Sequence, residues 1–144
     1  MKPLRNFEEF IEDGTVAKTT ANMPRAKSLT GEAERRKKFL NEMLEKIGMN
    51  DDNANYFIES SYDVLISLIR AKLLAHGFTS SGKGAHEAEV SFMRRLDFPE
   101  NDVRFMNDLR YYRNGILYYG ERFNADYGKK AVDFMERIFA KLNA

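Results

Sequence analysis

Apolar residues recur at intervals of three and four positions along most of the chain, which is the spacing of amphipathic helices. Glycines at positions 14, 48 and 77 follow these patterns and are typical of helix C-termini. The pattern predicts a short helix over residues 4–13 and longer helices over about residues 30–48, 52–77, 85–96, 103–120 and 124–142. Apolar residues cover more than one face of the 52–77 segment, so we expect this helix to be central.

Residues 14–29 lack this periodicity. They contain glycine, proline and several threonines, and they predict an extended linker, lying over the surface or mobile. No segment shows the apolar and polar alternation of a strand bounded by turns. Because the connections between helices are short, neighbouring helices are expected to run antiparallel. The sequence thus predicts an all-α, up-and-down bundle of about five helices over residues 30–144, preceded by a short helix and linker over residues 1–29.

The composition fits one globular domain, because 144 residues with 43% hydrophobic and 31% charged side chains can bury a sizeable core. The net charge of +1 does not by itself indicate a nucleic-acid-binding protein. The absence of cysteine excludes disulfides, thiolate catalysis and cysteine-based metal sites. No apolar run reaches the length of about 18 residues that spans a bilayer, and the acidic N-terminal stretch is unlike a secretory signal. We expect a cytoplasmic protein without a membrane partner.

Charge is distributed unevenly along the chain. Residues 15–38 carry seven Lys or Arg residues and two Glu residues, whereas residues 39–63 carry six acids and one Lys. The favoured interpretation is a solvated helix face with compensation from its neighbour. The alternative is a basic surface that binds phosphate.

The stretch "GFTSSGKG", residues 77–84, nearly matches a phosphate-binding P-loop. Lys83 has the required place, but position 84 is Gly where the motif needs a hydroxyl for magnesium, and a helix precedes it instead of a strand. We therefore expect an exposed loop between helices. Lys83 remains a candidate for contact with a phosphate.

The two histidines of the chain do not predict a metal site. The stretch "HEAEV" begins like a zinc-protease motif, but Val90 occupies the position of the second histidine. No Glu-x-x-His pair supports a di-iron bundle. A metal site built from carboxylates alone is the alternative left open, but we expect neither a metal nor a cofactor. His86 lies in the first turn of a predicted helix, where capping or packing is favoured over chemistry.

The stretch "LRYYRNGILYYG", residues 109–120, is the main candidate for function. Arg110 and Arg113 are three positions apart and share a helix face. Arginine binds phosphate with two parallel hydrogen bonds, and the surrounding tyrosines can stack on bases. Alternatively, the tyrosines are anchors of the core or of a protein interface.

Two stretches in this order, "YDVLISLIRAKLLAHGFTSSGKGAHEAEVSF" and "YRNGILYYG", resemble the HEPN family of small helical bundles over about residues 30–142. Many members are metal-independent endoribonucleases, often toxins paired with a nucleotidyltransferase antitoxin, and they dimerise with both Arg-His motifs in one cleft. The resemblance implies that Arg113 holds the scissile phosphate and that Asn114 orients the substrate or the arginine. It also implies that Tyr118 stands at the position of the histidine that handles the 2′-hydroxyl proton.

Tyrosine at position 118 changes the expected chemistry. Its reference pKa is about 10 against about 6.5 for histidine, so it is a poor general base at neutral pH. Arg113 and Tyr118 are also about 140° apart on a straight helix, and they converge only if the helix bends at Gly115 or a partner subunit completes the site.

The sequence therefore predicts a HEPN-like homodimer that binds RNA or a nucleotide in the dimer cleft, non-catalytic or weakly ribonucleolytic. Its expected binding residues are Arg110, Arg113, Lys83 and His86. One alternative is a metal-independent endoribonuclease toxin with a nucleotidyltransferase antitoxin partner, using Arg113, Asn114 and Tyr118. The other is a helical protein-interaction module without a nucleic-acid ligand.

Overall fold

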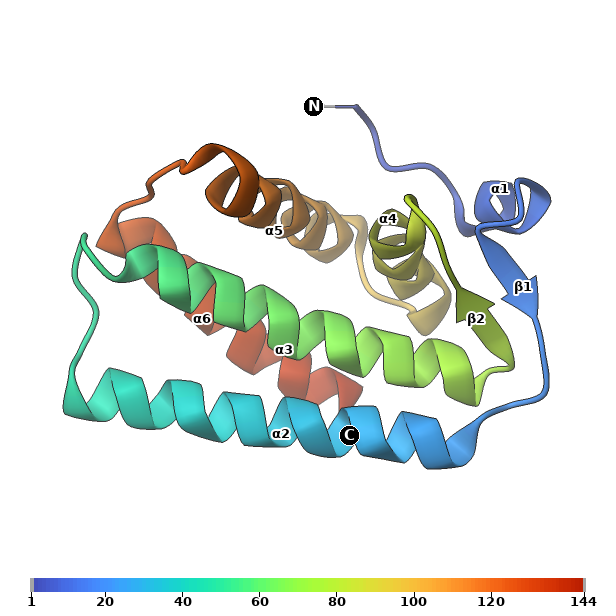
Figure 1. The fold of residues 1–144 in the computed structure, drawn as a ribbon, viewed down its shortest axis with the longest axis horizontal. Helices are drawn as coiled ribbons and strands as arrows, with labels where there is room; N and C mark the ends of the chain where they lie inside the picture. Colours follow the sequence, from blue (N-terminus) through green and yellow to red (C-terminus); the bar gives the residue numbers. More distant parts are fainter. Residues whose placement is uncertain (1, 144) are drawn as a thin grey trace.

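Helix α3 (Ala54–Ala75) is the central element of the computed structural model, which describes residues 2–143 (Figure 1). Its buried side chains, among them Ile58, Leu65 and Ile69, lie on several sides of the helix. Helices α2 (Met23–Lys46), α4 (Ala85–Ser91), α5 (Glu100–Tyr119) and α6 (Ala125–Leu142) all contact it. The expectation of a central helix packed on several sides is confirmed.

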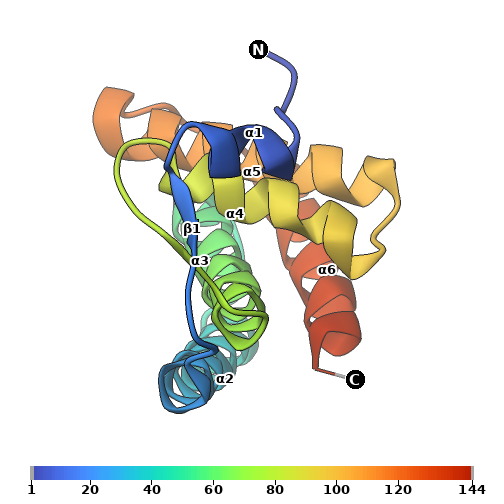
Figure 2. The same cartoon turned by 90° about the vertical axis from the view of Figure 1, so that its right-hand side faces the viewer.

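The helices surround α3 in two groups. Helices α2 and α3 run antiparallel side by side, and α6 packs on another side of α3 (Figures 1 and 2). Helices α4 and α5 contact each other and cover a further face of α3. The predicted all-α bundle is confirmed as an architecture.

A small sheet and a short helix lie beside one end of α3. Strand β1 (Val16–Lys18) pairs antiparallel with β2 (Phe78–Ser80), and Val16 lies opposite Ser80. Helix α1 (Phe7–Glu12) adds Phe7, whose ring packs on Phe78 and on Phe92 with centroids 5.2 and 5.0 Å apart. The sheet corrects the expectation that no strand would form. Three-residue strands are too short to show alternation in the sequence.

Helix α2 begins at Met23, seven residues before the expected start near Thr30. The Asn22 side chain accepts a hydrogen bond from the Arg25 amide at 3.1 Å, and Pro24 lies in the first turn. Proline is compatible with that turn because the amide it lacks has no partner within the helix. Residues 14–29 are therefore not an irregular linker, because they hold β1 and the start of α2.

Helix ends mostly agree with the predicted positions. Gly14, Gly48 and Gly77 have positive φ angles of 83°, 82° and 82° and follow α1, α2 and α3. Asn124 caps α6 by accepting from the Tyr127 amide at 3.0 Å. The helix expected over residues 85–96 is instead split into α4 and the 3-10 helix η1 (Phe92–Leu96).

Within residues 2–143, no helix combines the length and the apolar character needed to cross a bilayer.

Candidate functional site

An open groove of about 1180 Å³ lies along the C-terminal half of α5. Its walls come from three parts of the chain: the N-terminal segment, α4, and α5 with Glu121, two positions beyond its end. We call it the α5 groove; it is lined by Lys2, Pro3, Arg5, Glu87, Arg110, Tyr111, Asn114, Gly115, Tyr119 and Glu121. It combines three cations, two carboxylates, an amide and two aromatic rings.

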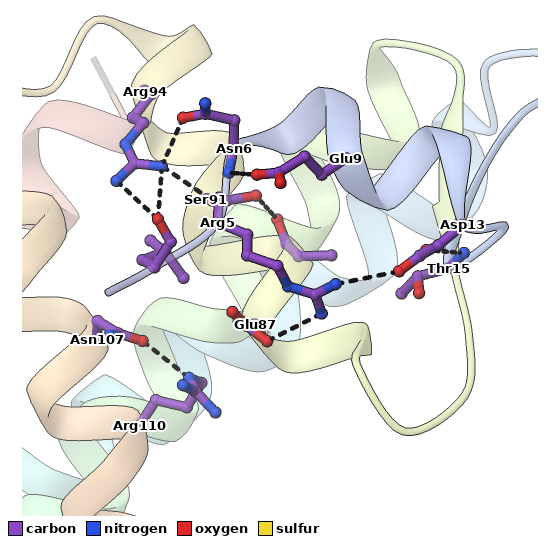
Figure 3. Close-up of polar contacts among 12 residues, drawn as sticks. Arg5, Asn6, Glu9, Asp13, Thr15, Glu87, Ser91, Arg94, Asn107 and Arg110 are labelled. Carbon is purple, nitrogen blue, oxygen red and sulfur yellow. Dashed lines mark hydrogen bonds and ion pairs between the residues drawn. The ribbon is translucent and has the colours of Figure 1, made fainter. Parts of the chain in front are cut away.

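Arg110 is the α5 cation that lines this groove. Its Nε donates to Asn107 Oδ1 at 3.0 Å, one helical turn earlier (Figure 3). Asn107 is buried, so it holds the base of the guanidinium group in place. The expected ligand contacts Arg110 and Asn114 thus share one groove.

The N-terminal strap, residues 2–6, forms another wall. Arg94 of η1 holds it by donating to the carbonyl of Arg5 at 2.9 Å, to the carbonyl of Leu4 at 3.3 and 3.4 Å, and to Asn6 Oδ1 at 3.3 Å (Figure 3). Glu100 accepts from the same guanidinium at 2.7 and 3.1 Å. Three acceptor atoms of residues 4–6 thus bind one arginine, which Glu100 holds from its other side, and these contacts fix this part of the strap against η1.

Within the strap, Arg5 faces the groove. One terminal nitrogen pairs with Glu87 of α4 at 3.3 Å and the other with Asp13 at 3.3 Å (Figure 3). The hydrogen bond to Glu87 is the main cause that raises the pKa of Arg5, so its charge is permanent. The sequence does not indicate Arg5 as a site residue, because 105 positions separate it from Arg110 and no motif links the two.

Arg113 points toward α3. Its guanidinium pairs with Asp63 at 3.4 Å and lies over the Tyr62 ring, 5.8 Å from the centroid. Its Nε is buried and has no hydrogen-bond partner among the described residues. Nearby, burial and the charge of Asp63 raise the pKa of Glu59. Arg113 therefore joins α5 to α3 and sits within a cluster of charged groups.

His86 lies in the same interhelical region. Its Nδ1 and the Tyr62 hydroxyl share a 3.0 Å hydrogen bond, and the two rings stack. Burial lowers the pKa of His86 below its usual value, so the imidazole is neutral at pH 7. Burial likewise raises the pKa of Tyr62, which stays protonated. Tyr62 thus lies between His86 and Arg113.

A buried carboxylate, Glu89, was not anticipated from the sequence. It accepts two hydrogen bonds from Arg70, one of them at 2.9 Å, and a third from the Ser80 hydroxyl at 2.9 Å. Its side chain is 1% exposed. It joins α4 to α3 and to β2. An acidic residue between two apolar ones, Ala88 and Val90, in a short helix is the signal in the sequence for such a pair.

The four tyrosines of α5 have different surroundings. Tyr112 packs on Phe123 and Tyr127 with ring centroids 4.9 and 5.4 Å apart, as a core anchor does. Tyr111 and Tyr119 line the α5 groove. Tyr118 is 73% exposed. The alternative that the tyrosines are anchors therefore holds for Tyr112.

Arg113 and Tyr118 lie on a continuous helix. α5 runs through Gly115 without interruption and ends at Gly120, whose φ is +65°. The Glu121 amide then donates to the Gly115 carbonyl at 3.2 Å. Gly115 therefore does not end or interrupt α5 between Arg113 and Tyr118.

Gly115 has another role. A Cβ at this position would lie 2.3 Å from Oε2 of Glu121, so the missing side chain leaves room for that carboxylate on the groove wall. The remaining candidate, Lys83, is an exposed residue between β2 and α4. It does not line the groove.

Among residues 2–143, no three His, Asp or Glu side chains gather as metal ligands would. Comparison of the chain with protein-family models, with curated proteins and with solved structures finds no match.

Proposed function

We propose that this chain is a HEPN-like protein that binds single-stranded RNA, or the nucleotide unit of it, in the α5 groove. The observation that carries the proposal is that cations, stacking rings and hydrogen-bonding groups line one open groove. Arg110 and Asn114 come from α5, and Arg5 comes from the strap. Binding without strong catalysis is proposed because α5 carries no histidine beside Arg113.

Phosphate is the group that the cations suit. Arg110 is held at Nε by Asn107, which leaves its terminal nitrogens toward the groove. Guanidinium binds phosphate oxygens through parallel hydrogen bonds, which are stronger than those between neutral groups. The Asn114 amide adds a donor and an acceptor one turn further along α5.

Single-stranded nucleic acid suits the rest of the groove. Tyr111 and Tyr119 offer ring faces for stacking of unpaired bases, an interaction worth about 1–3 kcal/mol per base. The carboxylates of Glu87 and Glu121 accept hydrogen bonds from ribose hydroxyls or exocyclic amino groups.

A homodimer belongs to this proposal. Leu117 and Tyr118, which do not line the groove, are 47% and 73% exposed at the end of α5. Burial of such side chains against a second copy would extend the groove across the dimer axis. Dimerisation through the C-terminal end of α5 would make Tyr118 an interface residue, a role that needs no contact with Arg113.

One observation favours a second function, metal-independent RNA cleavage. His86 is neutral at pH 7 and hydrogen-bonds Tyr62, whose ring lies under Arg113. A neutral imidazole can act as a general base, and an arginine on the other side of the Tyr62 ring can bind the phosphate. This form of the proposal includes a toxin role with a nucleotidyltransferase antitoxin partner. Cleavage in EDTA that is lost in both His86→Asn and Arg113→Ala would support it.

Fluorescence anisotropy with a labelled single-stranded RNA of about 12 nucleotides tests the binding proposal. Arg110→Ala should raise the Kd about tenfold, because one charged hydrogen-bonding group is lost. Arg104→Ala is the matched control, since Arg104 is an exposed arginine of the same helix outside the groove. Equal Kd values for the two variants, or no binding by the wild-type chain, would favour the protein-interaction module.

A further inference from the structure

We infer that the N-terminal strap is part of the ligand site and that Arg5 contacts the phosphate of single-stranded RNA, giving up its ion pair with Glu87 when the RNA binds. The inference rests on the proposed function. It adds a ligand-binding residue that the α5 sequence does not indicate, and it assigns a binding role to the strap.

The strap is fixed before any ligand arrives. Arg94 donates to the carbonyl oxygens of Leu4 and Arg5 and to Oδ1 of Asn6 (Figure 3). The backbone amide of Asn6 in turn donates to Glu9 Oε2 at 2.8 Å. Further along, Arg95 pairs with Glu8 at 2.9 Å. A segment held at several points loses little further entropy when a ligand binds to it.

Arg5 and Arg110 lie on two walls of the same groove, so a ligand bound to Arg110 would also contact Arg5. Both side chains line the α5 groove, Arg5 from the strap and Arg110 from α5, and Figure 3 shows Glu87 in the space between these two segments. A groove with a guanidinium on each of two walls can hold two phosphates of one strand. Lys2 and Pro3 continue the strap wall beyond Arg5.

The present partners of Arg5 can be exchanged at low cost. Its pairs with Glu87 and Asp13 are both 3.3 Å long, and its side chain is 44% exposed. Exposed pairs of this kind are weak because water screens them and holding two side chains costs entropy. A phosphate offers the guanidinium two oxygens at once, which favours the exchange. Glu87 then becomes available to accept a hydrogen bond from the ligand.

Glu87 is therefore a competitor for Arg5 in the free protein. Replacing it with Gln keeps a hydrogen-bond acceptor for the ligand but removes the charge. This should favour RNA for two reasons, because Arg5 is released and a negative charge leaves the groove. This predicts opposite effects for two neighbouring substitutions: Arg5→Ala weakens binding and Glu87→Gln strengthens it. A purely structural role of the Arg5–Glu87 pair predicts the same direction for both.

The test is anisotropy with the same labelled RNA over a range of salt concentrations. Arg5→Ala should raise the Kd about tenfold and lower the slope of log K against log salt by about one. Glu87→Gln should lower the Kd about threefold. The matched control is Arg36→Ala, because Arg36 is 50% exposed with a 3.7 Å pair to Glu32 on α2, and it should leave the Kd unchanged. Far-UV circular dichroism checks that each variant is folded.

The outcomes separate the two proposals. The inference is overturned if Arg110→Ala loses binding while Arg5→Ala behaves like Arg36→Ala, and the proposed function then stands. It is also overturned if Arg5→Ala and Glu87→Gln weaken binding alike. Both proposals fail if the wild-type chain does not bind the RNA, or if Arg36→Ala alone weakens binding, which would place the RNA on the basic face of α2.

Discussion

The Tyr62 hydroxyl lies 3.0 Å from His86 Nδ1, and the two rings stack with centroids 6.0 Å apart at an interplanar angle of 18°. Because Tyr62 is fully buried, its hydroxyl depends on this partner. The pair joins α3 to α4 beneath Arg113. It ties the packing of α3 on α4 to the protonation state of His86.

His86 should make stability depend on pH. Burial lowers the pKa of His86 in the folded chain, whereas unfolded histidine titrates near pH 6.5. Below about pH 6.5 the unfolded chain therefore binds more protons, and the free energy of unfolding decreases as the pH falls. Above that pH this penalty is absent. Urea unfolding at pH 7.5 and 5.5 measures the difference.

The substitution His86→Asn isolates this effect, since its side chain keeps a hydrogen-bonding group near the position of Nδ1. Between pH 7.5 and 5.5 the variant should lose less stability than the wild-type chain. An equal loss in both proteins would mean that His86 is not the group responsible.

Glu89 should be the most important carboxylate for stability. Glu89→Ala leaves the Arg70 guanidinium and the Ser80 hydroxyl without their buried partner, and we expect a loss of about 3 kcal/mol in the free energy of unfolding. Glu100→Ala is the control, because Glu100 is 54% exposed in its pair with Arg94. Its loss should be about 1 kcal/mol or less. Similar losses in the two variants by urea unfolding would contradict the assignment.

Two glycine-to-alanine substitutions should have opposite effects. At Gly115 the new Cβ meets only the end of the exposed Glu121 side chain, which can move, and alanine is favoured within a helix by about 1 kcal/mol. Gly115→Ala should therefore be stabilising by up to about 1 kcal/mol. At Gly77, φ is +82° and the Cβ would lie 2.9 Å from the Thr19 carbonyl oxygen. Gly77→Ala should destabilise by about 1–3 kcal/mol.

Thermal unfolding of the two variants and the wild-type chain compares these effects directly. A lower Tm for Gly115→Ala would contradict the prediction. It would mean that the packing of the Glu121 carboxylate against Gly115 stabilises the chain. An unchanged Tm for Gly77→Ala would contradict the close approach of Thr19, the residue after β1, to the end of α3.

Periodicity predicts most of this fold because the helices carry their own signals. The 3.6-residue repeat, the glycines at positions 48 and 77 and the cap at Asn124 are local features. The start of α2 also has a local signal, because Asn22 followed by Pro24 is typical of a helix N-terminus. The same proline, however, is one of the features that predicted a linker.

The sheet and the groove depend on contacts that are distant in sequence. Val16 pairs with Ser80, and neither three-residue strand shows a period of its own. Arg5 reaches the groove on a strap that Arg94, 89 positions away, helps to hold there. Local pattern indicated Arg110 and Asn114 within α5, but it does not reveal which way a helix faces. Arg113, on the same stretch, turned toward Asp63 instead.

Photocrosslinking of 4-thiouridine-substituted single-stranded RNA, followed by peptide mapping, tests the central claim most directly. Binding in the α5 groove predicts crosslinks at Tyr111 or Tyr119, and their loss in Arg110→Ala. Crosslinks confined to α2 or to the loop that holds Lys83, with none on α5, would contradict the account.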